Sequence, residues 1–487
     1  MLDRLREGGA ALSRVTERWV PDAWVILMSL TVVALLLAVT GGGASMPEAG
    51  LAWGAGVWTL LELAMQFSIA MVAAHACASS PPVYRLLDRL ARCPNPERPV
   101  QAVALAAGFS MAVGYLNWAF GLVGSALFVP FILKRNPRAD VRLVVAAAYM
   151  GIGTVWQSGL SSSAPLIMAT PGNPLLEPGT GAPVVDRLYP VTETLFHPFN
   201  LGYAAAMLLV GLVAAMALHP HRGAVTLTEA EVDEILPAPP PRAETATTPA
   251  ERLDRFRGWS LLAALLFAYP LAHSIVTRGF GASWTINAYN TVFLVLAIVL
   301  HGRPTSFLRA CRDGVGAAWG IILQFPFYAG IFGLIQNTNL GGWLGEQFAA
   351  VATTRLYPLV VYVYSGIMSM FIPSAGSKWM IEAPYVIPAG EVLDVSVMTV
   401  LLAYAYGDSA FNLIPPVLGA PHPCRDAAPL RGDLWVRLPP LAGDDPPRSR
   451  DHARDPDSLV TLVKTVTLVK TVTLMNEDCD AMKPVTP

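Results

Sequence analysis

Lys378 is the residue whose type and place point most directly to chemistry. It is the only Lys or Arg inside an apolar stretch of the second half of the chain, in the run PSAGSKW at residues 373–379. A charge within an apolar span marks a functional site by default, because burying it in hydrocarbon is costly. Its ammonium could pair with the carboxylate of a substrate. The alternative is a structural ion pair with Glu382, one helical turn later.

Mostly neutral polar residues accompany Lys378 where the apolar pattern is interrupted. They are Asn117, Thr154, Gln157 and Ser158 in the first half, and Ser374, Ser377, Asp408, Ser409 and Asn412 in the second. Hydroxyls, amides and carbonyls with few carboxylates suit a monovalent cation or a small carboxylate better than a divalent metal ion. We expect a central cluster that binds substrate and ion, with no certain metal site. For a single Ser or Thr, the alternative is a hydrogen bond to nearby backbone.

Four carboxylate, amide and imidazole side chains need separate treatment. Asp408, beside a predicted helix break, could ligate Na⁺ or relay a proton, and its alternative role is a counter-charge to Lys378. Glu62 and Gln66 lie four residues apart and share one face of a helix. With His75 they could form a proton relay, but we favour interhelical hydrogen bonding.

Composition places these residues in a membrane protein. The chain has 487 residues, of which 54% are hydrophobic and 14% charged, and the mean hydropathy is +0.47. Soluble domains average about 45–50% apolar and about 25% charged residues. The net charge of -2 gives no basic field for nucleic acid, and the five cysteines form no C-x-x-C pair. An ordinary soluble globule, a nucleic-acid binder and a disulfide or zinc framework are therefore excluded.

The first half, residues 22–218, is predicted to cross the membrane several times after a cytoplasmic amphipathic start at 1–21. Basic residues mark cytoplasmic loops, which puts the N-terminus inside, with a first span at 22–40 running outward and a second at 53–78 returning. Residues 100–133 are apolar, too long for one span and flanked by basic loops on both sides, so we expect a re-entrant hairpin with its tip at 114–121. Residues 143–169 are expected to form a helix broken near 156–161. Small residues for close helix packing are the alternative.

The second half, residues 258–414, follows a cytoplasmic linker at 219–257 that reads as a flexible tether. A span around 314–335 is expected to be interrupted at residues 324–326 (QFP), and 356–389 is again too long for one crossing. The first hairpin carries Ser110-Met111 before Trp118 and the second carries Ser369-Met370 before Trp379, and AAYMG at 147–151 resembles AYAYG at 403–407, so the offsets lie within 256–261. An odd number of crossings separates the hairpins. We therefore predict an all-α polytopic membrane protein with inverted repeats, two re-entrant hairpins and broken transmembrane helices.

This architecture is typical of secondary transporters. Inverted repeats with broken helices place substrate and ions near the midplane, where half-helix N-termini face anionic groups and unwound carbonyls bind cations. Two rival classes stay open. A channel should show rings of repeated pore-lining groups. An intramembrane hydrolase could use Ser374 or Ser377 with Lys378 as a Ser–Lys dyad, but no G-x-S-x-G or H-E-x-x-H motif accompanies them.

Several motifs resemble the short-chain fatty acid transporter family, within the ion transporter superfamily. They are RWVPDA at 18–23, TPGNP at 170–174, QFPFYAG at 324–330, PSAGSKW at 373–379 and AYGD at 405–408. The resemblance implies a carrier of short monocarboxylates such as acetoacetate or butyrate in a bacterial inner membrane. No cofactor is implied beyond a coupling H⁺ or Na⁺, and the lipid bilayer and a homodimer are the implied partners, although no sequence feature identifies an interface.

The resemblance also implies roles for individual residues. It assigns substrate binding to Asn117, Trp118, Thr154, Gln157, Ser158, Ser374, Ser377, Lys378 and Trp379, and ion coupling to Asn117, Gly159, Ser374, Gly376, Asp408, Ser409 and Asn412. The role of the signature at 170–174 stays open.

The chain departs from the family pattern after Ile414. Family members continue with a run like QPFWALP and a further apolar span, whereas residues 415–487 are rich in Pro, Arg and Asp and repeat TLVKTV at 461–466 and 467–472. Codons for residues 416–421, read one base later, can begin PFWALP. We therefore predict a frameshifted, disordered tail, which would leave the second broken helix incomplete and put transport in doubt. A natural regulatory tail is the alternative.

Overall fold

The computed structural model describes residues 23–175, 183–219, 224–237, 239 and 247–412. Within these residues all regular structure is helical, which confirms the all-α prediction. Eight segments are long and apolar enough to cross a membrane. The predicted N-terminal segment 1–21 and the tail 415–487 lie outside the described residues.

The spanning candidates come from both halves of the chain. They are α2 (Ala23–Thr40), α4 (Leu61–Ala78), α6 (Pro99–Leu116), α7 (Trp118–Arg135), the broken segment Val141–Ala169, α10 (Pro198–Ala217), the segment Pro249–Arg278 that contains α13 (Arg257–Arg278), and α16 (Pro304–Asn337). Two shorter apolar helices are α15 (Ile286–His301) and α20 (Val397–Phe411). The remaining helices include α3 (Met46–Gly56), α5 (Pro81–Leu90), α17 (Leu340–Val351), α18 (Tyr357–Ser369) and α19 (Ala375–Val392).

The predicted first hairpin is a pair of helices, α6 and α7, joined at a single residue. Asn117 ends α6 in an extended conformation, and its side-chain oxygen accepts a hydrogen bond from the Phe120 N–H at 2.8 Å. Asn is a favoured N-cap because its oxygen satisfies one of the unpaired donors of the first turn. The turn is therefore tighter than the eight-residue tip expected from the sequence.

The break predicted in the next segment is confirmed. Helix α8 (Val141–Thr154) ends before a short 3₁₀ turn, η1 (Trp156–Ser158), and helix α9 (Ser163–Ala169) follows. All of η1 and α9 is buried in protein, which is the condition under which non-helical backbone is tolerated at membrane depth.

Two predictions about spans were wrong. Helix α16 runs for 34 residues through Pro326 without the expected interruption at 324–326. Transmembrane helices tolerate an internal Pro because neighbouring helices and side chains satisfy the freed carbonyl. The segment 53–78, expected to return as one span, contains two helices, α3 and α4, separated by a turn at 57–60.

The two halves repeat the same helix geometry. Asp140 and Ser396, 256 residues apart, are the N-caps of α8 and α20, and each side chain accepts a hydrogen bond from the backbone N–H three residues later. Ser110 of α6 donates to the Ala148 carbonyl at 2.6 Å, and Ser365 of α18 donates to the Tyr404 carbonyl at 3.0 Å. Ser365, rather than the Ser369 expected from the sequence, therefore corresponds to Ser110.

Glycines permit the closest helix contacts in both halves. A Cβ at Gly151 of α8 would lie 2.1 Å from the Ser110 carbonyl oxygen, and a Cβ at Gly407 of α20 would lie 2.1 Å from the Tyr362 carbonyl oxygen. Only glycine allows backbones to approach this closely. These contacts fix how α6 packs on α8 and how α18 packs on α20.

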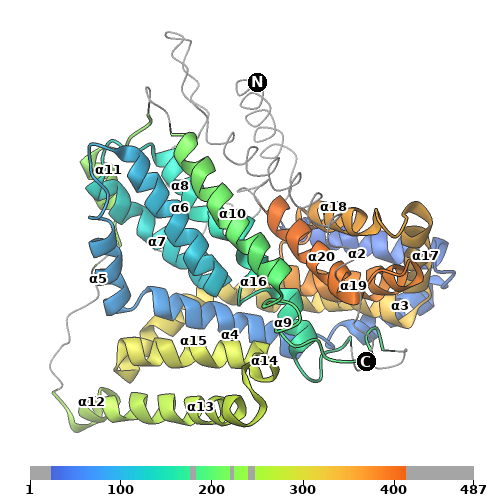
Figure 1. Ribbon diagram of the computed structural model, residues 1–487. Helices are drawn as coiled ribbons and strands as arrows, with labels where there is room; N and C mark the ends of the chain where they lie inside the picture. Colours follow the sequence, from blue (N-terminus) through green and yellow to red (C-terminus); the bar gives the residue numbers. More distant parts are fainter. Residues whose placement is uncertain (1–22, 176–182, 220–223, 238, 240–246, 413–487) are drawn as a thin grey trace.

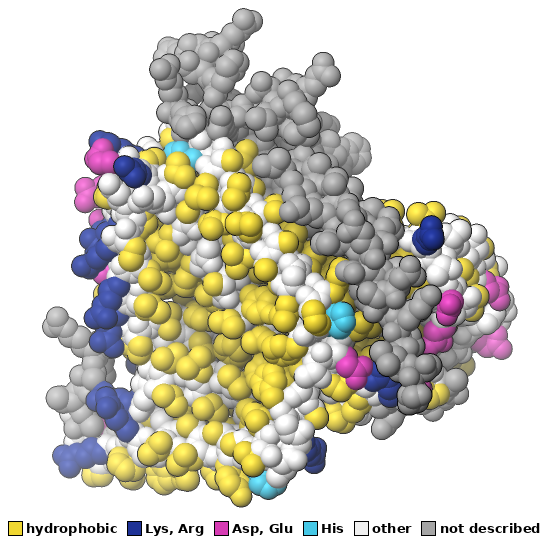
Figure 2. Space-filling model, in the orientation of Figure 1, with side chains coloured by type: hydrophobic (Ala, Val, Ile, Leu, Met, Phe, Trp, Pro, Cys, Tyr) yellow, Lys and Arg dark blue, Asp and Glu magenta, His cyan; other side chains and the backbone are white. Residues whose placement is uncertain are grey.

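The helix pairs of the two halves lie at opposite sides of the molecule. In Figure 1, α6 and α7 lie at the upper left, α18 and α19 lie at the right, and α20 and α9 lie between them. Figure 2 shows Lys and Arg gathered along the left edge, with a broad hydrophobic face beside them. That edge holds the ends of α5, α7 and α13 (Figure 1).

The linker at 219–257 is not a free tether over its described residues. It contains α11 (Glu229–Ile235) and α12 (Pro249–Asp254). Val225 exchanges hydrogen bonds with the start of α8, donating to the Asp140 carboxylate and accepting from the Val141 N–H, both at 2.9 Å. Lys134 of α7 forms an ion pair with Asp233 of α11 at 2.8 Å. The expectation of a flexible tether was wrong for this part, because these contacts hold it against α7 and α8.

Candidate functional site

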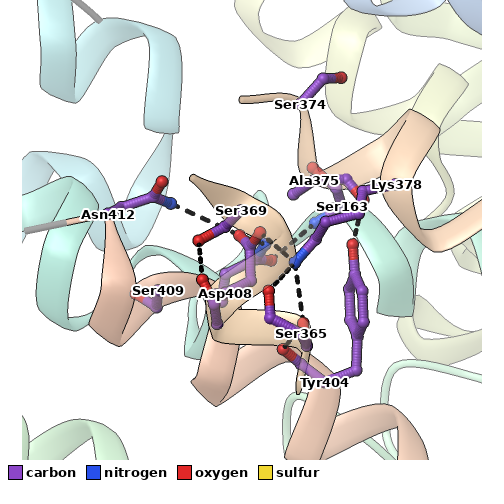
Figure 3. A network of polar contacts seen from close by, with 12 residues as sticks. Ser163, Ser365, Ser369, Ser374, Ala375, Lys378, Tyr404, Asp408, Ser409 and Asn412 are labelled. Carbon is purple, nitrogen blue, oxygen red and sulfur yellow. Dashed lines mark hydrogen bonds and ion pairs between the residues drawn. The ribbon is translucent and has the colours of Figure 1, made fainter. Parts of the chain in front are cut away.

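A buried ion pair lies at the centre of the predicted polar cluster. Lys378 Nζ on α19 lies 2.8 Å from Asp408 Oδ1 on α20, and the side chains are 0% and 2% exposed. Lys378 also donates to the carbonyl and the hydroxyl of Ser365, at 2.7 and 2.8 Å (Figure 3). A buried pair is stable only when further hydrogen bonds satisfy its remaining donors and acceptors. Asp408 is therefore the counter-charge of Lys378 in this conformation, and Glu382 is not paired with Lys378.

Tyr404 completes the surroundings of the ammonium. The Nζ of Lys378 lies 4.5 Å from the centre of the Tyr404 ring, and the phenol donates to the Ala375 carbonyl at 2.5 Å. A cation above an aromatic face is stabilised by the ring quadrupole, most strongly when it is desolvated. Tyr404 therefore links α20 to the first turn of α19 by its hydroxyl, and its ring contacts the Lys378 ammonium of that turn.

The first half reaches the same carboxylate through the broken helix. Gln157 of η1 donates from Nε2 to Asp408 Oδ2 at 2.7 Å. Its other amide atom, Oε1, accepts from the Ser162 hydroxyl at 3.0 Å and from the Ser163 N–H at 3.3 Å. Because the helix is broken here, the side chain can lie across the gap between the two halves. Gln157 therefore links the first half of the chain to the ion pair of the second half.

Asn412 and Ser409 lie on the same helix as Asp408. The amide of Asn412 donates to Asp408 Oδ2 at 3.5 Å, which is long for a hydrogen bond. Ser409 donates to the Ile152 carbonyl of α8 at 3.2 Å. The carboxylate therefore receives donors from Lys378, Gln157 and Asn412, which together stabilise its ionised form in a dry interior.

Four predicted hydroxyls are already satisfied by backbone. Thr154 donates to Met150 at 2.6 Å, Ser158 to Val155 at 2.8 Å, Ser377 to Ser374 at 3.2 Å, and Ser409 to Ile152. This is the alternative that the sequence left open for single Ser and Thr residues. In this conformation their hydroxyl hydrogens are not free for a ligand.

The first hairpin turn lies against the break. The Trp118 N–H donates to Ser161 Oγ at 2.8 Å, and Trp118 lies 6.0 Å from Trp156, measured between ring centres. A Cβ at Gly159 would lie 2.2 Å from the Tyr115 carbonyl oxygen, so this position requires glycine. The amide nitrogen of Asn117 is buried and has no partner among the described residues. This donor is therefore unused in the described conformation.

The second hairpin turn is held differently. Ser374 precedes α19 but its side chain makes no capping hydrogen bond, and Figure 3 shows it pointing away from the ion pair. A Cβ at Gly376 would lie 2.5 Å from the Phe67 ring, so glycine is needed for α19 to approach α4. Trp379 is fully buried, and its ring centre lies 4.6 Å from that of Tyr404. Ser374, Gly376 and Trp379 therefore lie near the pair without a hydrogen bond to it.

Helix α4 carries the interhelical hydrogen bonds that we favoured. Gln66 donates to Glu62 Oε1 at 3.1 Å and to Asn287 Oδ1 at 3.0 Å, and the Asn290 amide donates to the Gln66 carbonyl. These bonds tie α4 to α15. His75 lies against Gly314 of α16: a Cβ added at Gly314 would lie 3.1 Å from the Cβ of His75. These residues are separate from the Lys378–Asp408 pair.

The signature at 170–174 joins the broken helix to α15. Thr170 ends α9, its hydroxyl donates to Leu166, and it accepts a hydrogen bond from the Ile286 N–H at 3.1 Å. Asn173 accepts from the Leu175 N–H at 3.1 Å. The structure thus gives this motif a connecting role.

Three site residues were missed by sequence reasoning. Ser365 and Tyr404 contact Lys378 directly, and Ser161 supports the first hairpin turn. A repeat offset of 255 from Ser110 could have identified Ser365. Tyr404 gave no comparable signal, because an aromatic residue in an apolar helix is ordinarily part of the core.

Comparison with known proteins identifies the family. A family model described as short chain fatty acid transporter matches residues 1–424. The chain belongs to the short-chain fatty acid transporter family. A provisionally named short-chain fatty acid transporter of Escherichia coli K12 is 33% identical over 417 residues, covering 84% of this chain and 90% of the relative. One from Haemophilus influenzae is 30% identical over 416 residues, covering 84% and 91%.

Solved structures agree on the fold. The Alcanivorax borkumensis YdaH transporter, described as having an unusual topology, superposes with a TM-score of 0.55 at 15% identity, covering 96% of this chain and all of the other. The Neisseria gonorrhoeae MtrF protein, described among antimetabolite efflux pumps, gives the same TM-score and identity, covering 95% and 97%. Such low identity supports the fold alone.

Membership of the short-chain fatty acid transporter family makes the chain a membrane transporter and not an enzyme. The geometry agrees, because Lys378 Nζ contacts Asp408 and Ser365, whereas the Ser377 hydroxyl donates to backbone and Ser374 points away. A Ser–Lys dyad needs the amine beside the nucleophilic hydroxyl. The rival interpretation as an intramembrane hydrolase is therefore wrong.

Proposed function

We propose that this protein is an ion-coupled secondary carrier of short-chain monocarboxylates of the acetoacetate and butyrate type, working by alternating access in a bacterial inner membrane. One observation supports this most: the buried Lys378–Asp408 pair lies where the second hairpin, α20 and the broken helix of the first half meet. Helices α7 and α19 are the second helices of the first and second hairpins, and each begins at its hairpin turn. Their N-termini therefore add positive electrostatic potential near the middle of the fold.

The proposed binding step is an exchange of carboxylates on Lys378. In the described conformation the Asp408 carboxylate is paired with the Lys378 ammonium, and Gln157 donates a hydrogen bond to Asp408. A monocarboxylate has the same charge and two acceptor oxygens, so it competes with Asp408 for Lys378. Removing one partner of a buried pair is strongly unfavourable unless the charge left behind is compensated. The substrate anion therefore requires a cation at Asp408, which couples the two movements.

The compensating cation is H⁺ or Na⁺. Asp408, Ser409 and Asn412 supply oxygens on α20, Asn117, Ser374 and Gly376 supply oxygens at the two hairpin turns, and Gly159 supplies its carbonyl at the break of the first-half helix. Oxygen ligands of this kind suit a hard monovalent cation. The substrate side comprises Asn117, Trp118, Thr154, Gln157, Ser158, Ser374, Ser377, Lys378 and Trp379. For Thr154, Ser158 and Ser377 to bind substrate, their present backbone hydrogen bonds must be exchanged during transport.

The membrane orientation is part of the proposal. Basic side chains gather at one edge of the molecule (Figure 2), and that edge is assigned to the cytoplasm. The pair α6–α7 then re-enters from the cytoplasm and α18–α19 from the opposite side, which gives an inverted repeat and a cytoplasmic N-terminus. A homodimer is the proposed assembly.

Uptake into proteoliposomes tests the carrier. The full-length protein is reconstituted, and labelled butyrate uptake is followed with and without a Na⁺ or pH gradient, with unlabelled acetoacetate as competitor. Saturable accumulation that follows a gradient is expected. Passive conductance without accumulation would favour a channel, and uptake of wild-type size in Lys378→Ala would remove Lys378 from carboxylate binding. Arg355→Ala, an exposed basic residue at the start of the second hairpin, is the control and should transport normally.

Ion dependence tests the coupling residues. Asn117→Ala and Asp408→Glu each change a group assigned to the cation, so each should shift the Na⁺ or H⁺ concentration that gives half-maximal uptake. If neither variant shifts that concentration, both side chains serve packing instead.

Resequencing the gene around codon 414 tests the predicted frameshift at residues 415–487. An intact frame, supported by the intact mass of the protein, would assign this segment to a natural tail. A corrected frame should be assayed beside the present chain, because the rest of the second broken helix would then be restored.

A further inference from the structure

Glu382 is a buried carboxyl that the proposed carboxylate exchange does not use. It lies in α19, one turn after Lys378, and is 0% exposed. Neither of its carboxylate oxygens has a hydrogen-bond partner within the described part of the chain. Lys378, the nearest cation on its own helix, is paired with Asp408 and Ser365 instead. Glu382 is therefore a carboxyl without a counter-ion in a dry interior.

An isolated ionised carboxylate in such a place is prohibitively costly, and the group becomes neutral instead. Charge counting gives the same result. Lys378 and Asp408 neutralise each other, so a protonated Glu382 leaves the buried cluster without net charge, whereas an ionised one would leave an uncompensated negative charge. The conformation with the pair closed therefore holds one proton on Glu382.

The groups around Glu382 define what can change its protonation. Its electrostatic partners are Lys378 and Tyr385 on its own helix, Asp408 and Tyr404 on α20, and Tyr364 on α18. Of the other helices packed against α19, α9 carries no titratable side chain and α17 carries Glu346. Helix α16 carries Arg309, Cys311, Arg312, Asp313 and Tyr328, none of which is an electrostatic partner of Glu382. Lys378 is the only cation among the electrostatic partners of Glu382, so the position of its ammonium decides whether Glu382 can ionise.

We propose that Glu382 is a proton-binding site whose occupancy alternates with the Lys378–Asp408 pair. This inference rests on the carboxylate exchange proposed above and names the proton as a transported ion. While Lys378 is on Asp408, Glu382 keeps its proton. When a cation takes the place of Lys378 on Asp408 and no substrate holds the ammonium, the ammonium can reach Glu382 at the i, i+4 spacing that favours such pairs. The O–H bond of the carboxyl then breaks, the proton passes to water on the open side, and the carboxylate pairs with the ammonium.

The hydroxyls of Tyr364 and Tyr385 suggest the direction of that release. They lie 2.8 Å apart and join the buried side of α19 to α18, and Tyr364 is partly exposed whereas Tyr385 is buried. A pair of hydroxyls can pass a proton by exchanging donor and acceptor roles. Neither hydroxyl is hydrogen-bonded to Glu382 in the described conformation, so this route requires the Glu382 carboxyl to move toward Tyr385 during transport. Tyr364→Phe should then slow proton-driven uptake without changing substrate affinity.

Transport by Glu382→Gln is the first test, because the amide keeps the shape and cannot release a proton. In wild-type proteoliposomes, one coupled proton lets one pH unit drive about tenfold accumulation. Glu382→Gln should lose this accumulation and retain exchange of labelled for unlabelled butyrate at equal pH. Glu346→Gln is the matched control, because Glu346 lies exposed on neighbouring α17, and it should keep both activities. Full pH-driven accumulation in Glu382→Gln would overturn the proposal.

Infrared spectroscopy of the full-length protein is the second test and needs no transport. A protonated buried carboxyl gives a carbonyl stretching band at neutral pH, which Glu382→Gln should remove and Glu346→Gln should leave. A band unchanged in Glu382→Gln would overturn the proposal even if that variant transports nothing. If wild-type protein fails to transport any short monocarboxylate, the carrier proposal fails, while the band still decides whether Glu382 holds a proton.

Discussion

The two halves of the molecule have the same backbone contacts and different charges. In the first half, Ser110 binds α6 to α8 and Gly151 permits their close approach; in the second, Ser365 and Gly407 do the same for α18 and α20. The residue after Gly407 is Asp408, whereas the residue after Gly151 is Ile152. The repeated backbone supplies the shape, and a single asymmetric carboxylate decides which half holds the ion pair.

The first half contributes dipoles instead of charges. Helix α7 has no charged residue before Lys134, near its end, whereas α19 carries Lys378 in its first turn. From the first half, Gln157 reaches Asp408 with a neutral amide. Because the charged residues Lys378 and Asp408 both lie in the second half, a movement of that half can admit or release an anion. The neutral first half can keep its own hydrogen bonds during this movement. Four pairs of variants test this asymmetry.

The largest effect is expected from Asp408 and Ile152, which occupy equivalent places. Asp408→Asn removes the carboxylate that Lys378 pairs with in the described conformation, and breaking a buried pair costs about 3–5 kcal/mol. Ile152→Val should cost about 0.5–1.5 kcal/mol. Thermal unfolding in detergent measures both, and uptake should be lost only in Asp408→Asn. Equal losses of stability would mean that the charge asymmetry does not matter.

Gly151→Ala and Gly407→Ala should have equal effects, because each added Cβ would lie 2.1 Å from a carbonyl oxygen of the facing helix. Overpacking of this kind costs about 1–3 kcal/mol. Gly108→Ala is the control, because nothing lies within 4 Å of its added Cβ, and Ala in a helix is favoured over Gly by about 0.5–1 kcal/mol. Unfolding temperatures that fall for one of the two glycines alone would argue against equivalent packing in the two halves.

Ser365→Ala and Ser110→Ala separate charge from packing. Ser365 receives a charged hydrogen bond from Lys378, worth about 1.5–3 kcal/mol, whereas the bond from Ser110 to Ala148 is neutral and worth about 1 kcal/mol. Butyrate uptake should fall in Ser365→Ala, stay unchanged in Ser110→Ala, and recover in Ser365→Thr. The same decrease in both variants would assign these serines to packing alone.

The smallest difference is expected at the two hairpin turns. Asn117 caps α7 through the Phe120 N–H, and the loss of such a cap costs about 1 kcal/mol, whereas Ser374 makes no capping bond. Asn117→Ala should lower the unfolding temperature, and Ser374→Ala should not. A decrease for Ser374→Ala would reveal a capping contact at the second turn.

The sequence predicted those features that depend on local order along the chain. Apolar runs too long for one span became the helix pairs α6–α7 and α18–α19, and the glycine- and serine-rich run at 151–163 became the break between α8 and α9. Proline was a less reliable signal, since α16 continues through Pro326. Helix breaks in membranes depend on whether neighbouring groups satisfy the backbone, and those neighbours are far away in sequence.

The sequence also selected Lys378 and Asp408 individually, but it left their partners open. Glu382 lies closer to Lys378 along the chain, whereas Asp408 lies 30 residues away and is the actual partner. Local spacing favours the i, i+4 pair. Packing of α18 on α20 brings Ser365 and Tyr404 to the ammonium as well, and these additional contacts favour Asp408.

The sequence by itself determined that this is an all-helical membrane protein with several spans, a break in the segment 143–169 and a lysine in an apolar stretch of its second half. These properties follow from hydropathy and residue type, which act over one or two helical turns. Only the tertiary structure decided that Lys378 pairs with Asp408, that Gln157 joins the first half to this pair, and that the Glu382 carboxyl has no hydrogen-bond partner among the described residues. Choices among buried charges depend on which groups desolvate together, and that is fixed only when distant helices pack.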